Sequence, residues 1–426
     1  MSQDSHPTQV VIIERIAPGG DGMGRLSNGE WVFVRGAAAG DQLAIKNITR
    51  RKGVSRGDID RIVRAGPDRI EPSCPIATRC GGCDLMQLSA SGQSKAKLGI
   101  LKDALRRIGG GALEFPKLRY LNVGDGFSYR SRLRHHVDDA GNLGFSSARS
   151  KSIVPVPRCE VAEPSLNTAL LHLNSSANEY RRLLQLCDQI ELRAAEQEPM
   201  LVARLFPKSG LQLQPSKFQP LFPRNARILV AGSVDDDHTI QSYELANNVV
   251  ISVPASAFLQ VHRGINSILV TNVVQAATSR GLQSFVDTYA GAGNFTLPLL
   301  AAGLIGESID CAAAGILAAR SVARDCRLPF AGFNVGDARE QLEALVRNRR
   351  QFDLVLLDPP RAGAKDVLSL ALQLRPRLVA IVACDPVTLA RDLKTLLSGG
   401  GRLEELTIYD MFPQTHHMET LALVAI

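Results

Sequence analysis

Residues 285–310 read FVDTYAGAGNFTLPLLAAGLIGESID, and this stretch decides the fold of the C-terminal part of the chain. An apolar run leads into a Gly-Ala-Gly turn, a helical segment and a second apolar run that ends in aspartate. FDLVLLDPP (352–360), RLVAIVAC (377–384) and TLALVAI (420–426) continue the series, with helical segments between most of them. Helices alternating with apolar strands predict a parallel α/β sheet from about residue 264 onward.

Ligands of parallel sheets bind beyond the carboxyl ends of the strands, so we expect the chemistry there. Gly291 and Gly293 let the backbone turn sharply and approach a ligand closely. The next strand ends at Asp310, whose carboxylate can accept hydrogen bonds from ribose hydroxyls. Thr296 occupies the place of the third glycine in the dinucleotide motif GxGxxG. A cofactor with a ribose and no pyrophosphate therefore fits better, and S-adenosylmethionine is our candidate.

Two further strand ends carry candidate catalytic groups. Asp358-Pro-Pro-Arg361 forms a rigid turn of the kind that holds a planar base in nucleic-acid methyltransferases, although it could simply terminate a strand. Cys384 ends the next strand, with Asp385 suited to cap the following helix. The helix dipole favours a thiolate and lowers a thiol pKa below about 8.5, whereas the adjacent Asp385 opposes this. The alternative for Cys384 is a small buried apolar residue.

The N-terminal half has a different pattern. Residues 8–66 contain short alternating or β-branched runs separated by Gly-rich turns, which predicts a small β-barrel. GPDRIEPSCP (66–75) then indicates a domain boundary. The net charge is +7, and basic side chains cluster in residues 46–64 (seven basic, two acidic) and 117–158 (eight basic, three acidic). Such clusters suit a polyanion, or else form a solvated basic face.

Three cysteines, Cys74, Cys80 and Cys83, form a tight cluster, and Gly81-Gly82 lets the backbone wrap closely around a centre. A tetrahedral zinc or a cubane cluster needs a fourth ligand, and Cys159 is the best-placed candidate. Four cysteines alone slightly favour zinc over iron–sulfur. Eight cysteines in 426 residues are too sparse for a disulfide scaffold.

Composition excludes several classes. Hydrophobic residues make up 45% and charged residues 21%, which argues against disorder or a fibrous repeat. No apolar run approaches the roughly 18–20 residues that a membrane span needs. The start, MSQDSHPTQ, lacks the pattern of a secretory signal, so we expect a cytoplasmic protein without membrane partners.

Taken together, these motifs resemble the RNA uracil-5 methyltransferase family, and most closely its 23S rRNA branch, over nearly the whole chain. The resemblance implies three domains: a TRAM RNA-binding barrel of the OB type at 8–66, an α+β middle domain at 67–255, and a Rossmann-like class I methyltransferase domain at 256–426. It places an iron–sulfur cluster and RNA contacts in the middle domain. The helix predicted over 91–110 could pack on the catalytic domain.

The family also implies roles for individual residues. Cys74, Cys80, Cys83 and Cys159 match its four ligands to a 4Fe-4S cluster, which reverses the preference for zinc. Cys384 matches the family nucleophile and Glu419, in HHMETLAL, its base. The positions that match cofactor contacts are Gln260 in the FxQ segment, Tyr289, Asn294, Asp310, Asp337 and Asp358. Asp385 replaces the usual Asn, and a negative charge beside a thiolate disfavours it.

The resemblance predicts a monomeric enzyme, with no obligate protein partner, that methylates carbon 5 of a specific uracil in RNA, with 23S rRNA preferred. A transfer RNA target is the alternative within the family. One rival is a methyltransferase acting on exocyclic amines, although Arg361 follows Asp-Pro-Pro where an aromatic residue would be expected. The other is a non-catalytic RNA-binding or iron–sulfur protein, against which intact Cys384 and Glu419 argue.

Overall fold

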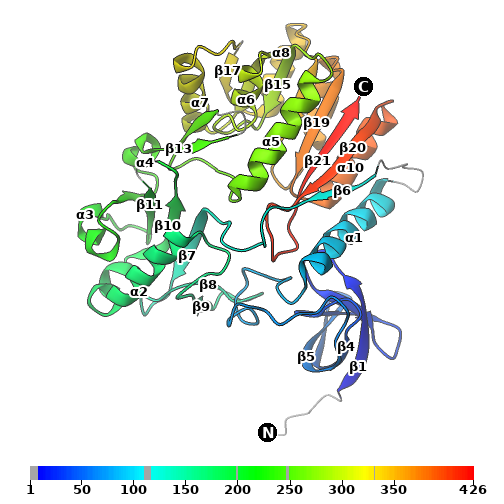
Figure 1. The fold of residues 1–426 in the computed structure, drawn as a ribbon, viewed down its shortest axis with the longest axis vertical. Helices are drawn as coiled ribbons and strands as arrows, with labels where there is room; N and C mark the ends of the chain where they lie inside the picture. The colour runs from blue at the N-terminus through cyan, green and yellow to red at the C-terminus, as the bar shows by residue number, and fades with distance from the viewer. Residues whose placement is uncertain (1–7, 110–116, 198–199, 246–248, 331) are drawn as a thin grey trace.

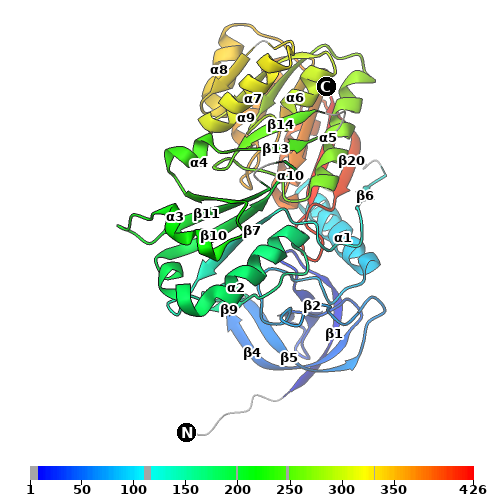
Figure 2. The ribbon, with the colours of Figure 1, turned by 60° about the vertical axis from the view of Figure 1, so that its left-hand side comes forward.

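The computed structural model describes residues 8–109, 117–197, 200–245, 249–330 and 332–426. Three bodies are arranged around the centre of the molecule: a small barrel, a middle sheet flanked by helices, and a large α/β layer (Figures 1 and 2). Among the described residues, no helix combines the length and apolar character needed to cross a bilayer.

The N-terminal body is a closed five-stranded barrel with strand order β1-β2-β3-β5-β4, and β1 also pairs with β4. Its strands are β1 (Gln9–Ile16), β2 (Gly22–Arg25), β3 (Trp31–Val34), β4 (Gln42–Arg51) and β5 (Val54–Arg64). Alternation decides which side chains fill the barrel: Val11 and Ile13 are buried, whereas Val10 and Ile12, which alternate with them, are exposed. The predicted barrel is confirmed.

The middle body is a six-stranded sheet of order β12-β11-β10-β7-β8-β9. Its strands are β7 (Arg132–Val137), β8 (Leu143–Ser146), β9 (Ile153–Pro155), β10 (Cys187–Ala194), β11 (Leu201–Pro207) and β12 (Ala226–Val230). The accompanying helices are α2 (Pro164–Leu184), α3 (Pro215–Phe218), the 3-10 turn η1 (Gln219–Leu221) and α4 (Val234–His238). An apolar core between α2 and the sheet holds this body together.

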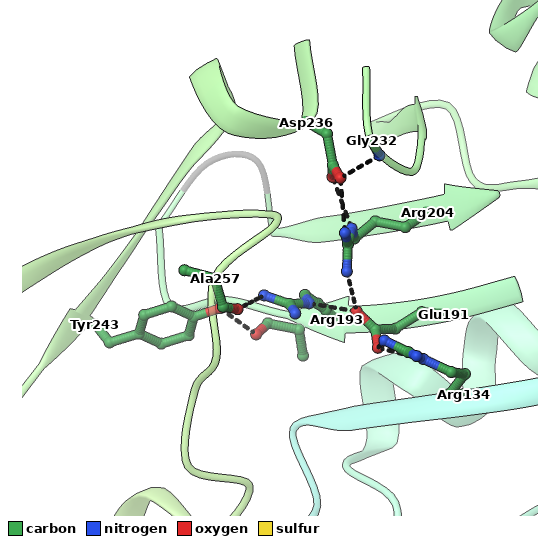
Figure 3. A network of polar contacts seen from close by, with 9 residues as sticks. Arg134, Glu191, Arg193, Arg204, Gly232, Asp236, Tyr243 and Ala257 are labelled. Atoms are coloured by element: carbon green, nitrogen blue, oxygen red, sulfur yellow. Dashed lines mark hydrogen bonds and ion pairs between the residues drawn. The ribbon is translucent and has the colours of Figure 1, made fainter. Parts of the chain in front are cut away.

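Buried charges in this middle sheet are tied into one network (Figure 3). Glu191 accepts hydrogen bonds from Arg134 at 2.7 and 2.9 Å, from Arg193 at 2.7 Å and from Arg204 at 2.9 Å. Arg204 also donates two 2.6 Å bonds to Asp236 on α4. Arg193 reaches out of the sheet to the carbonyl oxygen of Ala257 at 2.8 Å, so the network continues to the segment that leads to α5 (Arg263–Thr278).

The C-terminal body is an eight-stranded sheet of order β17-β16-β15-β18-β19-β21-β20-β6. β15 to β19 are parallel to one another, whereas β21 is antiparallel to both β19 and β20. The strands are β15 (Ser284–Thr288), β16 (Ile305–Asp310), β17 (Gly332–Val335), β18 (Leu354–Leu357), β19 (Leu378–Ala383), β20 (Arg402–Tyr409) and β21 (Glu419–Ala425). Besides α5, the helices are α6 (Thr296–Ala301), α7 (Ala313–Asp325), α8 (Ala338–Arg347), α9 (Lys365–Gln373) and α10 (Pro386–Ser398). The predicted α/β sheet is confirmed.

Segments from earlier in the chain complete this sheet. α1 (Ala90–Gly109) packs against α10 and buries Ile100, Leu101 and Leu105 in the same core; residue 110 lies outside the described residues. β6 (Arg119–Leu121) adds a parallel edge strand next to β20. The hairpin β13 (Ile240–Glu244) and β14 (Val250–Pro254) packs its apolar side chains into the core beside α5 and α7. The C-terminal body therefore depends on residues far outside 256–426.

Candidate active site

The carboxyl edge of the parallel strands gathers several of the residues singled out from the sequence. Tyr289 directly follows β15, and Asp310 is the last residue of β16. Asp358 directly follows β18, and Cys384 directly follows β19. Because β15, β16, β18 and β19 are parallel neighbours or next neighbours, these four residues lie along one edge of the sheet.

Glu419 reaches the same edge from the opposite direction. β21 runs antiparallel to β19, and Thr420 pairs with Ala383. The register therefore places Glu419, the first residue of β21, next to Cys384. The sequence analysis had assigned Glu419 its role only by resemblance, and strand pairing now supplies a geometric reason for its proximity to the thiol.

The sequence left the pKa of the Cys384 thiol open, because the helix dipole lowers it and the adjacent Asp385 opposes that effect. Burial raises its pKa to about 11, and the nearby charge of Glu419 adds to the increase. Arg361 opposes it, since its positive charge favours the thiolate. Desolvation and a carboxylate from a distant strand therefore outweigh the helix terminus.

Asp385 has a defined structural task beside this thiol. Its Oδ1 accepts hydrogen bonds from the backbone N–H groups of Val387 and Thr388, both at 2.9 Å, and so caps α10. Pro386 follows at the first helical position, where a missing N–H costs nothing. The carboxylate that replaces Asn thus directs its charge to the helix amides.

Three carboxyl groups at the edge hold their protons more tightly than usual. The pKa of Glu419 is raised well above its ordinary value by burial and by the charge of Asp358. Burial and Asp310 raise the pKa of Asp358 to about 7. Burial raises the pKa of Asp287 to about 8, although its Oδ2 accepts a 2.6 Å hydrogen bond from Thr296. Carboxyl groups packed this closely cannot all ionise together.

Several polar side chains around this edge have no partner. Among the described residues, the side chains of Asp358 and Glu419 make no hydrogen bond or ion pair to another residue, nor does that of Gln260 shortly before α5, and Asp287 Oδ1 is buried without a partner. Buried polar groups in folded proteins are nearly always paired, so unpaired ones beside a thiol indicate a place for a ligand. His135 and Arg181 in the middle body also have buried nitrogen atoms without a partner, so this feature is not confined to the edge.

The glycine loop after β15 is built around Asp310. Tyr289 and Gly291 have φ angles of +65° and +56°, in the left-handed region that glycine tolerates best. Asp310 Oδ2 accepts from Gly291 N at 2.8 Å, and its Oδ1 accepts from Ala312 N at 2.7 Å. Asp310 therefore fastens the loop, and its remaining lone pairs are what it can offer to a ligand.

Two other residues predicted to contact the cofactor form hydrogen bonds within the protein. The side-chain amides of Asn294 and Asn266 on α5 exchange two hydrogen bonds, at 2.7 and 3.0 Å. Asp337 caps α8 by accepting from the amides of Arg339 and Glu340, at 2.9 and 3.2 Å. Burial is the main cause of the raised pKa of Tyr289, and the charge of Asp337 adds to it, so Asp337 lies near Tyr289.

Sequence reasoning gave no role to Arg361, the cation that faces Cys384. Its charge also contributes to the lowered pKa of His417, for which burial is the main cause. A signal was present, since Arg361 follows Asp-Pro-Pro directly at the end of a strand, at the edge where ligands bind. Asn266 carried no comparable signal, because its partner Asn294 lies on a different element.

The four predicted metal-ligating cysteines line one cavity in the middle of the molecule. Cys74, Cys80, Cys83 and Cys159 share it with apolar side chains such as Ile76, Met86, Phe145, Val156 and Val161. Gly82 N–H points to Cys80 Sγ at 3.4 Å. Within the described ranges, however, no three Cys, His, Asp or Glu side chains are placed closely enough to hold a metal ion. The structure brings the thiols to one cavity without assembling a ligand shell.

Comparisons with known proteins agree with this architecture. The family model described as TRAM domain matches residues 7–59, and the model described as tRNA (Uracil-5-)-methyltransferase matches residues 224–425. The chain is similar to the 23S rRNA (uracil(1939)-C(5))-methyltransferase RlmD of Shewanella sp. (strain W3-18-1), with 30% identity covering 93% of this chain and 91% of that one. The protein of the same name from Vibrio cholerae (strain M66-2) is 30% identical and covers 97% of this chain and 95% of its own.

The fold is also similar to that of Pyrococcus abyssi tRNA (uracil-54, C5)-methyltransferase, solved in complex with S-adenosyl-L-homocysteine. The TM-score is 0.74 at 23% identity, over 97% of this chain and 100% of that chain. Together with the sheet order and the glycine loop, these similarities identify an S-adenosylmethionine-dependent methyltransferase. The chain belongs to the RNA uracil-C5 methyltransferase family, with an N-terminal TRAM domain, as its motifs led us to expect.

Proposed function

We propose that this enzyme methylates carbon 5 of a uridine in 23S rRNA, with Cys384 as the nucleophile and Glu419 as the base. The names of the relatives that match over nine-tenths of the chain support ribosomal RNA as the target. The observation that carries the two catalytic roles is the β19–β21 register, which puts a thiol beside a buried, unpaired carboxyl group. Monomeric state and cytoplasmic location belong to the same proposal.

The chemistry requires both groups. Carbon 5 of uracil is too weak a nucleophile to take a methyl group directly. Cys384 Sγ therefore bonds to carbon 6, and the electrons of the 5,6 double bond move into an enolate that makes carbon 5 nucleophilic. S-adenosylmethionine, when bound, supplies the electrophilic methyl group that carbon 5 attacks. Glu419 then accepts the proton on carbon 5, the 5,6 double bond reforms, and the Sγ–carbon 6 bond breaks to return the thiolate.

Proton state is the main demand on these residues. The Cys384 thiol has to lose its proton to water before it can attack, and Arg361 is the cation that favours its thiolate. Glu419 has to be ionised when the carbon 5 proton leaves, although burial raises its pKa. A buried base with a raised pKa holds an abstracted proton more strongly than an exposed carboxylate would.

We propose Gln260, Tyr289, Asn294, Asp310, Asp337 and Asp358 as the residues that hold the cofactor. Gln260 and Asp358 have unengaged side chains, so they can bind without breaking an internal bond. Asp310 and Asn294 already hold the loop and α5, so each can offer only its remaining donors or acceptors. Their first effect would be to fix the shape of the pocket.

We propose that Cys74, Cys80, Cys83 and Cys159 bind a 4Fe-4S cluster. Four thiols around one largely apolar cavity, with an amide already donating to Cys80 Sγ, are a suitable donor set. Since the reaction involves no net oxidation or reduction, the cluster would stabilise the structure of the middle domain. Metal and sulfide analysis of anaerobically purified protein tests this: Cys83→Ser should lose the iron, whereas Cys326→Ser, at an exposed cysteine, should keep it. Zinc without iron would contradict the assignment.

The test of the catalytic roles is incubation with RNA that contains 5-fluorouracil. Fluorine cannot leave carbon 5 as a proton does, so the adduct should stay on Cys384. Mass spectrometry of the trapped peptide identifies the nucleophile, and the attached RNA fragment identifies the site. Offering a 23S rRNA fragment and a transfer RNA together separates the two targets. An adduct on a different residue, or none, would contradict the proposal.

A further inference from the structure

The loop between β20 and β21 ends at Glu419, and residues from the first third of the chain hold it in place. Lys97 on α1 is fully buried, and its Nζ donates to Asp410 Oδ1 at 2.5 Å and to the Phe412 carbonyl oxygen at 3.1 Å. Tyr120 donates its hydroxyl to Asp410 Oδ2 at 2.6 Å. The first residues of the loop are thereby fixed to α1 and β6.

The centre of the loop is held by a second set of bonds. The side chain of Gln93 accepts from Gln414 N and donates to Gln414 Oε1, both at 2.9 Å. The backbone N–H groups of Asp84 and Leu85 both donate to the Gln414 carbonyl oxygen, at 3.1 and 3.0 Å. Gln414 has a φ of +67°, a conformation that costs a non-glycine residue about 1 kcal/mol, so these bonds also hold a strained residue.

The end of the loop, three residues before Glu419, is held by Asp84. Asp84 Oδ1 accepts from the backbone N–H of His416 at 2.7 Å, and its Oδ2 lies 2.5 Å from His416 Nδ1. Asp84 directly follows Cys83, so the segment that carries the cysteines is also bonded to the segment that leads into β21. None of these contacts uses a group that the proposed reaction needs.

We propose that Asp84 is a positioning residue for Glu419, acting through the backbone and ring of His416. This inference rests on the proposed function, because it assumes that Glu419 is the base. A base has to lie within hydrogen-bond reach of the proton it removes, and a displacement of about 1 Å can cost about 100-fold in rate. The two contacts of Asp84 with His416 fix the position and the direction of the backbone where it enters β21.

A misplaced Glu419 should slow only one half of the reaction. Glu419 acts only after the methyl group has reached carbon 5, so a misplaced Glu419 leaves adduct formation intact and slows its breakdown. Loss of Asp84 should therefore accumulate RNA bonded to Cys384. A merely structural residue would lower both halves together and leave the ratio of adduct to released product unchanged.

The experiment compares Asp84→Ala and His416→Ala with the unaltered protein, using a 23S rRNA fragment that spans the counterpart of uridine 1939 and radiolabelled S-adenosylmethionine. Quenched samples on a denaturing gel separate the adduct from released methylated RNA. Both variants should raise the ratio of adduct to product at least about tenfold. Asp68→Ala, which removes the half-buried carboxylate that pairs with the exposed Lys95, is the matched control and should leave the ratio unchanged.

The controls separate the possible failures. His416→Ala lies outside the cysteine segment, so it carries the test if Asp84→Ala folds poorly; iron content and melting temperature are measured for each variant. No methylation by the unaltered protein, or no adduct with Glu419→Gln, would overturn the proposed function. If both behave as expected while Asp84→Ala and His416→Ala match Asp68→Ala, only the positioning role is wrong.

Discussion

The middle sheet and the catalytic edge each contain a buried glutamate, and the two environments shift its pKa in opposite directions. Glu191 is fully buried and accepts hydrogen bonds from three arginines, and these charges lower its pKa to about 2 despite the burial (Figure 3). Glu419 is almost as buried, yet it faces Asp358 and Cys384 and its pKa is raised well above the ordinary value. Burial is nearly equal, so the neighbours decide the protonation state.

The difference separates charges that stabilise the fold from charges that are available for chemistry. A carboxylate surrounded by guanidinium groups is fixed in one state and holds strands together. A carboxyl group left beside another carboxyl and a thiol keeps its proton and can exchange it. Four predictions test this difference.

The largest effect is expected at the catalytic edge. Cys384→Ala should lower the initial rate of methyl incorporation into RNA by at least about 10³-fold, because it removes the thiolate that adds to carbon 6. The melting temperature should change little. Cys326→Ala, at an exposed cysteine, is the control and should retain the rate. Equal rates for the two variants would show that Cys384 is not the nucleophile.

The next effect concerns the middle sheet. Glu191→Gln should lower the free energy of unfolding by about 3–5 kcal/mol, because it leaves buried guanidinium groups without their counter-charge. Glu404→Gln removes a carboxylate that pairs with Arg280 and Arg402 nearer the surface, and should cost no more than about 1 kcal/mol. Denaturant titration measures both. Similar losses would show that the Glu191 network is no more than an ordinary set of ion pairs.

A third effect should appear in the pH dependence of the reaction. Cys384, with a pKa raised to about 11, and Glu419 both have to be ionised, so the single-turnover rate should increase with pH between about 7 and 9. One limiting ionisation gives up to about a tenfold increase for each pH unit. A rate that is flat or decreases over this range would mean that the groups ionise before the RNA complex reacts.

The smallest effect is a change in the free energy of unfolding, and its sign is opposite to that expected for Glu191→Gln. A carboxyl whose pKa is raised by folding stabilises the folded state at low pH, and that contribution is lost as pH increases through the folded-state value. Glu419→Gln keeps the neutral shape without this loss. Compared with the unaltered protein, it should gain about 1 kcal/mol or more in unfolding free energy between pH 5 and pH 8. A relative loss of stability with pH would contradict the assigned protonation state.

Local patterns made much of this architecture predictable. The strand, glycine turn and helix at 285–310 lie in one continuous stretch, and so do the barrel strands and the Asp385 cap of α10. In each case, neighbouring residues carry the whole signal. The family motifs added Glu419, which a pattern search alone would have passed over as one carboxylate before an apolar strand.

Long-range pairing could not be predicted from these patterns. The sequence does not show that β6 joins the edge of the C-terminal sheet, or that Asp84 holds His416. The direction of the Cys384 pKa shift stayed open for the same reason: the helix dipole and Asp385 are local and visible, whereas burial and the charge of Glu419 come from packing.

The antiparallel pairing of β19 with β21 has one more consequence. Alternate residues of a strand face opposite sides of its sheet, so a slip by one residue would send the acid to one side and leave the sulfur on the other. The spacing of the two reactive groups is thus encoded in a ladder of backbone bonds. A change of length in a surface loop leaves this ladder intact, whereas a shift of either strand by one residue does not.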